Sequence, residues 1–203
     1  MRCFRKPGAL PNWNEPPALI WRNGNGRKVS GGEIVGTAHF PDPWQGALIV
    51  GGYINNAVWA LQIRDDGSGF GLEDLPPLLK STSRNFRPVY AKFGPDGALY
   101  LCVWYNPIIG HYQASFRHPD RDKTHGRIWR VTAKGRPLTQ PPQLEGASVA
   151  ELLDHLKSSD RWTRYFAKRV LASMPKLPVT AALKNWTEQP GRSEHALVEA
   201  LGV

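Results

Sequence analysis

The stretch Gly94-Pro-Asp-Gly-Ala-Leu-Tyr-Leu-Cys-Val-Trp104 decides the fold of the first part of the chain. Its Asp-Gly pair suits a tight turn, because both residues tolerate the backbone conformations that such turns require. The residues that follow, Ala98 to Trp104, are apolar and aromatic, which favours a strand. Because both faces of this strand are apolar, we expect both to be covered by other elements.

A similar pattern lies upstream. Pro41-Asp-Pro-Trp-Gln-Gly-Ala-Leu48 leads to Val58-Trp59, and Pro95-Asp-Gly-Ala-Leu99 leads to Ile128-Trp129. The Gly-Ala-Leu strings are offset by 97 − 46 = 51 residues and the tryptophans by 129 − 59 = 70. The second copy therefore carries 70 − 51 = 19 more residues between its strands. A period of this size, with several strands per copy, is typical of a β-propeller blade or another β-repeat array.

Short apolar runs broken by Asn-Gly, Asp-Gly and Gly-Gly pairs continue through this part of the chain. Besides Ala98–Trp104, the clearest predicted strands are Ala47–Val50, Ala57–Ile63 and Arg127–Thr132. We interpret residues 18–136 as a partial β-propeller of about two blades, preceded by a disordered tail at residues 1–17. Natural propellers have at least about four blades, so we expect a piece of a longer protein with an open strand edge.

Helical periodicity replaces the strand pattern after a Pro-rich linker at residues 137–147. Ser148-Val-Ala-Glu151 forms a capping box, and four short helices are predicted over residues 148–203. The second ends at Pro175, the third has Pro178 in its first turn, and Ser193 caps a fourth that runs to the end of the chain. The predicted fold class is therefore β plus α, a partial β-propeller followed by HEAT-like α-helical hairpins.

Composition and motifs exclude several classes of protein. The chain of 203 residues is 41% hydrophobic and 21% charged, which is typical of a globular protein. The sequence shows no transmembrane segment and no signal-peptide pattern. Its two cysteines, Cys3 and Cys102, make neither a zinc ribbon nor a CxxCH haem motif. Nucleotide cofactors and the common hydrolase triads have no support, because their motifs are absent from the sequence.

The chain is basic, with a formal net charge of +9. Two groups of cations stand out: Arg84, Arg87 and Lys92 before the Gly94–Gly97 turn, and Arg161, Arg164, Lys168 and Arg169 on the second predicted helix. Together they could contact the phosphates of a nucleic acid. No nucleic-acid-binding motif accompanies them. We therefore interpret the helical group as a solvated basic face and predict no nucleic-acid partner.

The insertion between Trp104 and Arg127 is the candidate functional region, because loops on a rigid β scaffold commonly carry function. Its polar groups include His111, Arg117, His118, Asp120, Arg121, Asp122 and His125. Such a loop could hold a polar ligand or an anionic cofactor. Alternatively, the same groups order the loop, for example through ion pairs among its aspartates and Arg121. The histidines show no metal-ligand spacing, so we predict no metal site from them.

Four strings resemble the large membrane-bound dehydrogenase-like proteins of the planctomycete and verrucomicrobial group. They are Phe86-Arg-Pro88, Gly94-Pro-Asp-Gly-Ala-Leu-Tyr100, Trp104-Tyr-Asn-Pro-Ile-Ile-Gly-His111 and His125-Gly-Arg-Ile-Trp-Arg130. The resemblance covers about residues 18–203. It implies a glucose/sorbosone dehydrogenase-type propeller, then HEAT-like repeats and often a haem-binding CxxCH domain.

The resemblance further implies a periplasmic or otherwise extracytoplasmic quinoprotein-like dehydrogenase. Such a protein oxidises sugars or alcohols with pyrroloquinoline quinone and calcium, and passes electrons to a cytochrome c domain. From their place in the loop, His111 is the candidate proton acceptor and Asn106, Arg117 and Arg127 are the candidate cofactor-binding residues. The family has Asp where this chain has Tyr90 and Val103, so this copy has lost those carboxylates. The alternative is a non-catalytic scaffold that binds a protein or a polysaccharide.

Overall fold

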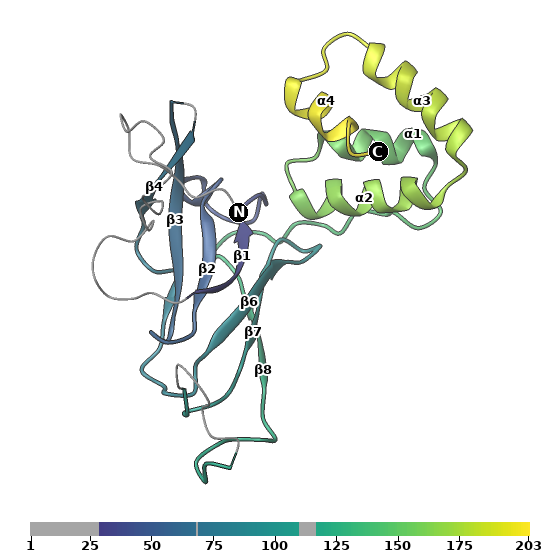
Figure 1. The fold of residues 1–203 in the computed structure, drawn as a ribbon. Helices are drawn as coiled ribbons and strands as arrows, with labels where there is room; N and C mark the ends of the chain where they lie inside the picture. The colour runs from purple at the N-terminus through teal and green to yellow at the C-terminus, as the bar shows by residue number, and fades with distance from the viewer. Residues whose placement is uncertain (1–28, 68, 110–116) are drawn as a thin grey trace, which may run out of the picture. The chain divides into compact units, whose positions relative to one another are not determined.

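A computed structural model describes residues 29–67, 69–109 and 117–203 of the chain. The described residues form a β-plus-α protein with open, antiparallel sheets and four α-helices (Figure 1). They divide into two compact units. The first takes residues 29–35, 42–92 and 99–131 from the described part, and the second comprises Gly36–Pro41, Phe93–Ala98 and Thr132–Val203. Within the described residues, no helix has the length and apolar character needed to cross a membrane.

The first sheet contains the predicted strands of the upstream copy. Four strands follow one another in chain order: β1 (Ser30–Ile34), β2 (Leu48–Gly52), β3 (Ala57–Asp66) and β4 (Gly69–Asp74). The two-residue strand β5 (Leu79–Lys80) also pairs with β3, beyond the end of β4. A short 3-10 helix, Asp42–Trp44, lies in the connection between β1 and β2. The predictions at Ala47–Val50 and Ala57–Ile63 are therefore confirmed, with small shifts at their ends.

The second sheet contains the apolar strand predicted after the Asp96-Gly97 turn. Its strands are β6 (Pro88–Phe93), β7 (Leu99–Val103) and β8 (Arg127–Val131), again in chain order. The expectation that β7 is covered on both faces holds fully for one face and only in part for the other. Leu99, Leu101 and Val103 are buried, whereas the alternate residues Tyr100 and Cys102 are only half-buried. Successive side chains of a strand point to opposite faces, and one face of β7 is better covered than the other.

The two hairpins repeat the same pairing at the offsets expected from the sequence. Val50 pairs with Trp59 between β2 and β3, and Leu101 pairs with Trp129 between β7 and β8. The shifts, 101 − 50 = 51 and 129 − 59 = 70, are those of the sequence repeat. All five residue pairs of the β7–β8 hairpin follow this rule. Because a one-residue slip would place every side chain on the other face, the shared register shows that the two segments are structural repeats.

In the first unit, strands β1 and β2 lie so close to strand β6 that glycine is required at two positions. A Cβ atom added to Gly51 of β2 would lie 2.4 Å from the main-chain oxygen of Pro88 in β6. Gly31 of β1 has a φ of +64°, and its added Cβ would lie 2.9 Å from the Cα atom of Tyr90. A side chain at either position would force the strands apart. Gly51 and Gly52 therefore lie in strand β2, where the absence of side chains allows neighbouring groups to pack closely against them.

In the second unit, a buried histidine forms hydrogen bonds with the segment that precedes the helices. His39 is 1% exposed, and its Nε2 atom accepts the N–H of Ala133 at 2.9 Å. Its other ring nitrogen, Nδ1, therefore carries the proton and donates to the main-chain oxygen of Pro137 at 2.8 Å. The Pro-rich stretch is held further by Thr139, whose N–H donates to the main-chain oxygen of Asp96 at 3.0 Å. This part of the Pro-rich stretch is fixed against its own unit by hydrogen bonds.

The first and fourth of the four helices begin after the capping residues predicted for them. The four helices are α1 (Val149–Asp154), α2 (Arg161–Ser173), α3 (Lys176–Glu188) and α4 (Glu194–Ala200), with a 3-10 turn at His155–Lys157 after α1. Both reciprocal hydrogen bonds of the Ser148–Glu151 capping box are present. Ser193 caps α4 by accepting the N–H of Ala196. The expectation that α4 runs to the end of the chain is wrong, because the helix ends at Ala200 and a turn follows.

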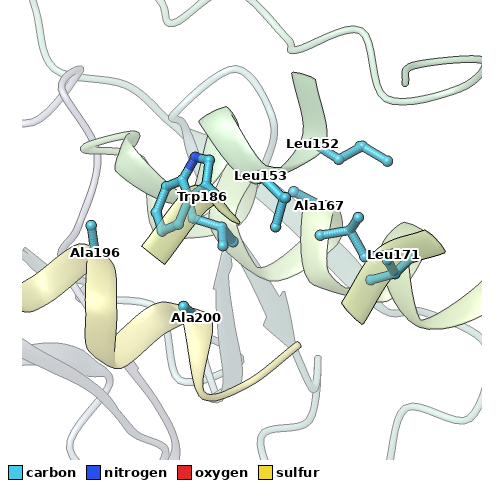
Figure 2. Close-up of a cluster of buried hydrophobic side chains, with 9 residues drawn as sticks. Leu152, Leu153, Ala167, Leu171, Trp186, Ala196 and Ala200 are labelled. Atoms are coloured by element: carbon cyan, nitrogen blue, oxygen red, sulfur yellow. The ribbon is translucent and has the colours of Figure 1, made fainter. Parts of the chain in front are cut away.

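One apolar core joins all four helices. Figure 2 shows its members, of which α3 contributes the largest, Trp186. The buried residues of this core are Leu152, Leu153, Leu156, Ala167, Leu171, Val179, Trp186, Ala196 and Ala200. The indole N–H of Trp186 donates to Asp154 Oδ1 at 3.3 Å, and the guanidinium of Arg192 lies 4.1 Å from its ring centroid. The indole N–H therefore has a hydrogen-bond partner while the ring is buried in the cluster.

Glu199 on α4 binds two of the cations assigned to the basic face of α2. Its carboxylate oxygens lie 2.9 Å from Arg164 Nε and 2.6 Å from Lys168 Nζ. Arg164 also donates to the main-chain oxygens of Ser158 and Ser159. The interpretation as a solvated basic face is therefore wrong for these two residues. Burial raises the pKa of Glu199, but the hydrogen bonds from Lys168 and Arg164 outweigh this effect and lower the pKa below its ordinary value.

We predict that Glu199→Gln destabilises the helical part of the second unit by about 3 kcal/mol, because it leaves the buried Arg164 without its counter-charge. Urea unfolding followed by circular dichroism at 222 nm would measure the loss. Since the folded-state pKa of Glu199 is lowered, its contribution is complete above the ordinary carboxyl pKa and disappears as the pH falls. The control is Glu188→Gln at the exposed end of α3, and equal effects of the two substitutions would contradict the prediction.

Candidate functional site

The candidate site lies in the first unit, where the chain leaves β7 and later enters β8. The described part of this connection comprises residues 104–109 and 117–126. Trp104 begins it, and its N–H donates to the main-chain oxygen of Arg87 at 2.9 Å. The Trp104 side chain remains 40% exposed. The segment therefore starts from a fixed point on the second sheet and places an aromatic ring at the surface.

Arg87 is the buried anchor of this region. It is 6% exposed, and its guanidinium donates to the main-chain oxygens of Tyr53 and Ile54 at 3.0 and 3.1 Å. It also donates to the main-chain oxygens of Asn106 and Pro107, at 3.1 and 3.4 Å. Burial, and secondly the nearby charge of Arg84, lower the pKa of Arg87. Among the described residues, its recorded partners are neutral carbonyl groups rather than carboxylates.

Asn106 places an unsatisfied donor beside this arginine. Its side chain is 1% exposed, and its Oδ1 atom accepts the N–H of Ile108 at 3.0 Å. Its Nδ2 atom is buried and has no acceptor among the residues that the structure describes. Most buried polar groups in proteins have a hydrogen-bond partner, and one without a partner calls for a specific explanation. An oxygen atom of a ligand or of a bound water would satisfy this amide.

Aromatic rings and cations line the outer part of the connection. The guanidinium of Arg127, at the start of β8, lies 4.7 Å from the ring centroid of Tyr105. The ring of His125 makes an edge-on contact with Tyr105 at 6.0 Å, and Arg121 lies 5.7 Å from the ring centroid of Trp104. Cation–π contacts of this kind orient arginines while leaving their N–H groups able to bind oxygen atoms.

Asp122 orders the last part of the loop. Its Oδ1 atom accepts the N–H groups of Thr124 and His125, each at 2.9 Å, and its Oδ2 atom lies 2.8 Å from His125 Nδ1. The N–H of Thr124 is the largest cause that lowers the pKa of Asp122 to about 2, with His125 contributing further. These contacts favour the interpretation in which Asp122 and His125 order the loop.

The predicted site residues fall in different environments. His111 lies outside the described residues, so its place is not assigned. Asn106 is buried, whereas Arg117 and Arg127 are exposed. The structure brings Arg127 next to Tyr105, the neighbour of Asn106 in the chain. Sequence reasoning treated Arg87 only as a phosphate contact and missed its buried role; an arginine just before an apolar strand, in Phe86-Arg-Pro88, was the available signal.

A shallow hollow adjoins the site on the second sheet. Its volume is about 480 Å³, and its lining is mostly apolar: Val89, Cys102, Val103, Trp104, Gly126, Arg127 and Ile128. Val103 is 5% exposed and Tyr90 is 48% exposed. No group of three or more His, Cys, Asp or Glu side chains suited to a metal occurs in the described part of the chain.

The structure thus defines a β-plus-α protein that contains two structural repeats and a polar, aromatic-rich insertion in the second repeat. The chain belongs to the family described as a domain of unknown function, DUF7133, which matches residues 17–135. The match includes both repeats and the complete candidate site. No curated protein and no solved structure matches the chain.

We predict that Arg87→Lys destabilises the first unit by about 2 kcal/mol, because an ammonium group cannot reproduce the fork of N–H groups that binds four carbonyl oxygens. Urea unfolding followed by tryptophan fluorescence would measure the change. Arg84→Lys is the matched control, since Arg84 is exposed and carries the same charge. A loss of stability no greater than that of the control would contradict the anchoring role.

We also predict that the Asp122 carboxyl titrates near pH 2. Because this pKa is lowered from 3.8, the carboxylate stabilises the loop fully above about pH 4, and this contribution disappears as the pH falls towards 2. Carboxyl carbon shifts in nuclear magnetic resonance would follow the titration. His125→Ala should raise the pKa only in part, since the Thr124 N–H remains. A midpoint at the ordinary value in the unaltered chain would disprove the assignment.

Proposed function

We propose that this chain is a section of a propeller-type sugar or alcohol dehydrogenase that uses a quinone cofactor. In this proposal the segment after β7 binds the oxygen-rich part of the cofactor or substrate. The observation that carries the proposal is the buried, unsatisfied Nδ2 atom of Asn106. Antiparallel sheets in chain order and a repeated register support propeller blades, and the four short helices support HEAT-like hairpins.

The donor chemistry of the site fits pyrroloquinoline quinone. This molecule carries carboxylate and quinone oxygens, which Asn106, Arg117 and Arg127 would bind through N–H groups. When bound, the quinone supplies an acceptor for the two electrons that leave the alcohol. Calcium prefers several oxygen ligands, and the described residues offer no carboxylate cluster for it. No role for calcium is therefore assigned to these residues.

The protein's own contribution would be to position the ligand. Arg87 fixes the main chain directly after the Asn106 Cα atom, because it donates to the carbonyl oxygens of Asn106 and Pro107. The Asn106 amide is then held in a defined place before the ligand arrives, which lowers the entropic cost of binding. His111 remains the proposed proton acceptor. An extracytoplasmic location, and transfer of electrons to a cytochrome c domain, belong to the same proposal.

A non-catalytic scaffold is the second candidate. Tyr90 and Val103 lack the carboxylates of the resembling family, and α2 presents a group of aromatic rings that a protein or polysaccharide could contact. Trp162 stacks on Phe166 at 4.2 Å, and Tyr165 is 54% exposed. Arg169 lies over both Tyr165 and Phe166.

Binding of pyrroloquinoline quinone to the full chain, measured by isothermal titration calorimetry, tests the first candidate. We predict saturable binding that Asn106→Asp weakens about tenfold, because the substitution removes the donor and adds a negative charge near an anionic ligand. Asn185→Asp at an exposed position of α3 is the control. Failure of the quinone to bind, or equal affinity for both variants, would contradict the proposal. Saturable polysaccharide binding without quinone binding would favour the scaffold.

A further inference from the structure

The chain between β8 and α1 is held by a histidine ring that has to be neutral. The Nε2 atom of His39 accepts the N–H of Ala133 at 2.9 Å, and its Nδ1 atom donates to the main-chain oxygen of Pro137 at 2.8 Å. One nitrogen accepts and the other donates, which only an uncharged imidazole can do. In a protonated ring both nitrogens are donors, so the Nε2 proton would point at the N–H of Ala133.

The surroundings of His39 also oppose a positive charge. The side chain is 1% exposed, and its ring makes an edge-on contact with Phe40, with the ring centroids 5.9 Å apart. Phe40 makes the same kind of contact with Phe93 at 5.1 Å. A Cβ atom added to Gly97 would lie 2.8 Å from the Cβ atom of His39, so the main chain packs closely here as well. A charged group buried in this way is costly unless a counter-charge lies against it.

The charged groups near His39 supply no such counter-charge to its ring. On the segments packed around it, the charged side chains are those of Asp96, Lys134, Arg136, Asp160 and Arg161. Both carboxylates accept main-chain N–H groups, Asp160 that of Ala38 at 3.3 Å and Asp96 that of Ala98 at 3.1 Å. Arg136 donates to the main-chain oxygen of His39 at 3.0 Å and adds a positive charge beside it. Within the described part of the chain, both ring nitrogens bind main-chain groups instead of a carboxylate.

The stretch that His39 holds has little else to keep it in place. Residues 132–139 are mostly exposed, and none of them belongs to the apolar core of the helices. Segments with few buried apolar contacts open at a lower free energy than the core of their unit. Loss of the hydrogen bond to Ala133 would therefore open this stretch before the helices unfold.

We propose that His39 is an acid-sensitive switch that controls the chain between β8 and α1. The neutral ring holds residues 132–139 against residues 36–41. When the ring takes up a proton, its bond to Ala133 is lost and residues 132–139 open, while the apolar core of the helices stays closed. This inference rests on the hydrogen bonds of His39 and not on the proposed redox activity.

The sign of the pH dependence follows from the two forms of the ring. The closed form needs the neutral ring, whereas a ring that is open to water takes up a proton as an ordinary histidine does, at about pH 6.5. The closed form is therefore fully stable above about pH 6.5 and loses stability as the pH falls below it, by up to about tenfold for each pH unit.

Amide hydrogen exchange on the full chain, followed by nuclear magnetic resonance between pH 7.5 and pH 5.5, tests the switch. Protection factors are compared, because they correct for the effect of pH on the exchange chemistry itself. The Ala133 amide should lose protection about tenfold over this range. The amide of Leu171, in the helical core, should keep its protection. Nitrogen shifts of the His39 ring at pH 7.5 should place its proton on Nδ1.

The matched variants are His39→Gln and His195→Gln, which replace a buried and an exposed histidine of the same unit. Glutamine does not titrate, so His39→Gln should lower the protection of Ala133 at pH 7.5 and remove its pH dependence. His195→Gln should leave that dependence at about tenfold.

Three results would overturn the proposal: protection of Ala133 that does not change with pH in the unaltered chain, equal losses at Ala133 and Leu171, or an unchanged pH dependence in His39→Gln. If His39→Gln does not fold, the ring shifts of the unaltered chain decide. Protons on both nitrogens of His39 while the Ala133 amide stays protected would likewise overturn it.

Discussion

The arrangement of the first unit depends on one buried cation. Arg87 gives its N–H groups to the turn after β2 and to the segment after β7, so a single guanidinium joins the two repeats. A planar fork of donors can satisfy several carbonyls at once, which a flexible ammonium cannot do. Beside Arg87, the main chain of Pro88 lies so close to Gly51 that an added Cβ atom would lie 2.4 Å from the Pro88 oxygen.

Periodicity and turn chemistry predicted much of the fold, because both act over a few residues. The offsets of 51 and 70 identified two copies of one pattern, whose hairpins the structure pairs in the same register, and Ser148 and Ser193 marked two helix starts correctly. Exposure was harder to predict. The half-covered face of β7 and the ion pairs of Arg164 with Glu199 depend on residues distant in the chain, which local patterns do not contain.

The candidate site shows the same division. Its location followed from the length of an insertion in a repeat, and Asn106 was among the residues named in advance. What each residue does depended on contacts across the unit. Arg87 looked like one cation among many until its carbonyl partners were known, and the ion pair of Asp122 with His125 was not foreseen. Hydrogen bonds to main-chain carbonyl groups cannot be predicted from residue types, because every residue has such a group.

The unsatisfied amide of Asn106 also has a thermodynamic consequence. In the unfolded chain water bonds to that amide, whereas in the folded chain its hydrogen atoms lack a protein acceptor among the described residues. Folding therefore removes this amide from bulk water, and the cost is recovered only where an oxygen atom of a ligand or of a bound water lies against it. Any molecule that places an oxygen there binds the native state alone, and by mass action its concentration sets how far the melting temperature rises. The protein would thus be most resistant to heat in the presence of whatever it evolved to hold.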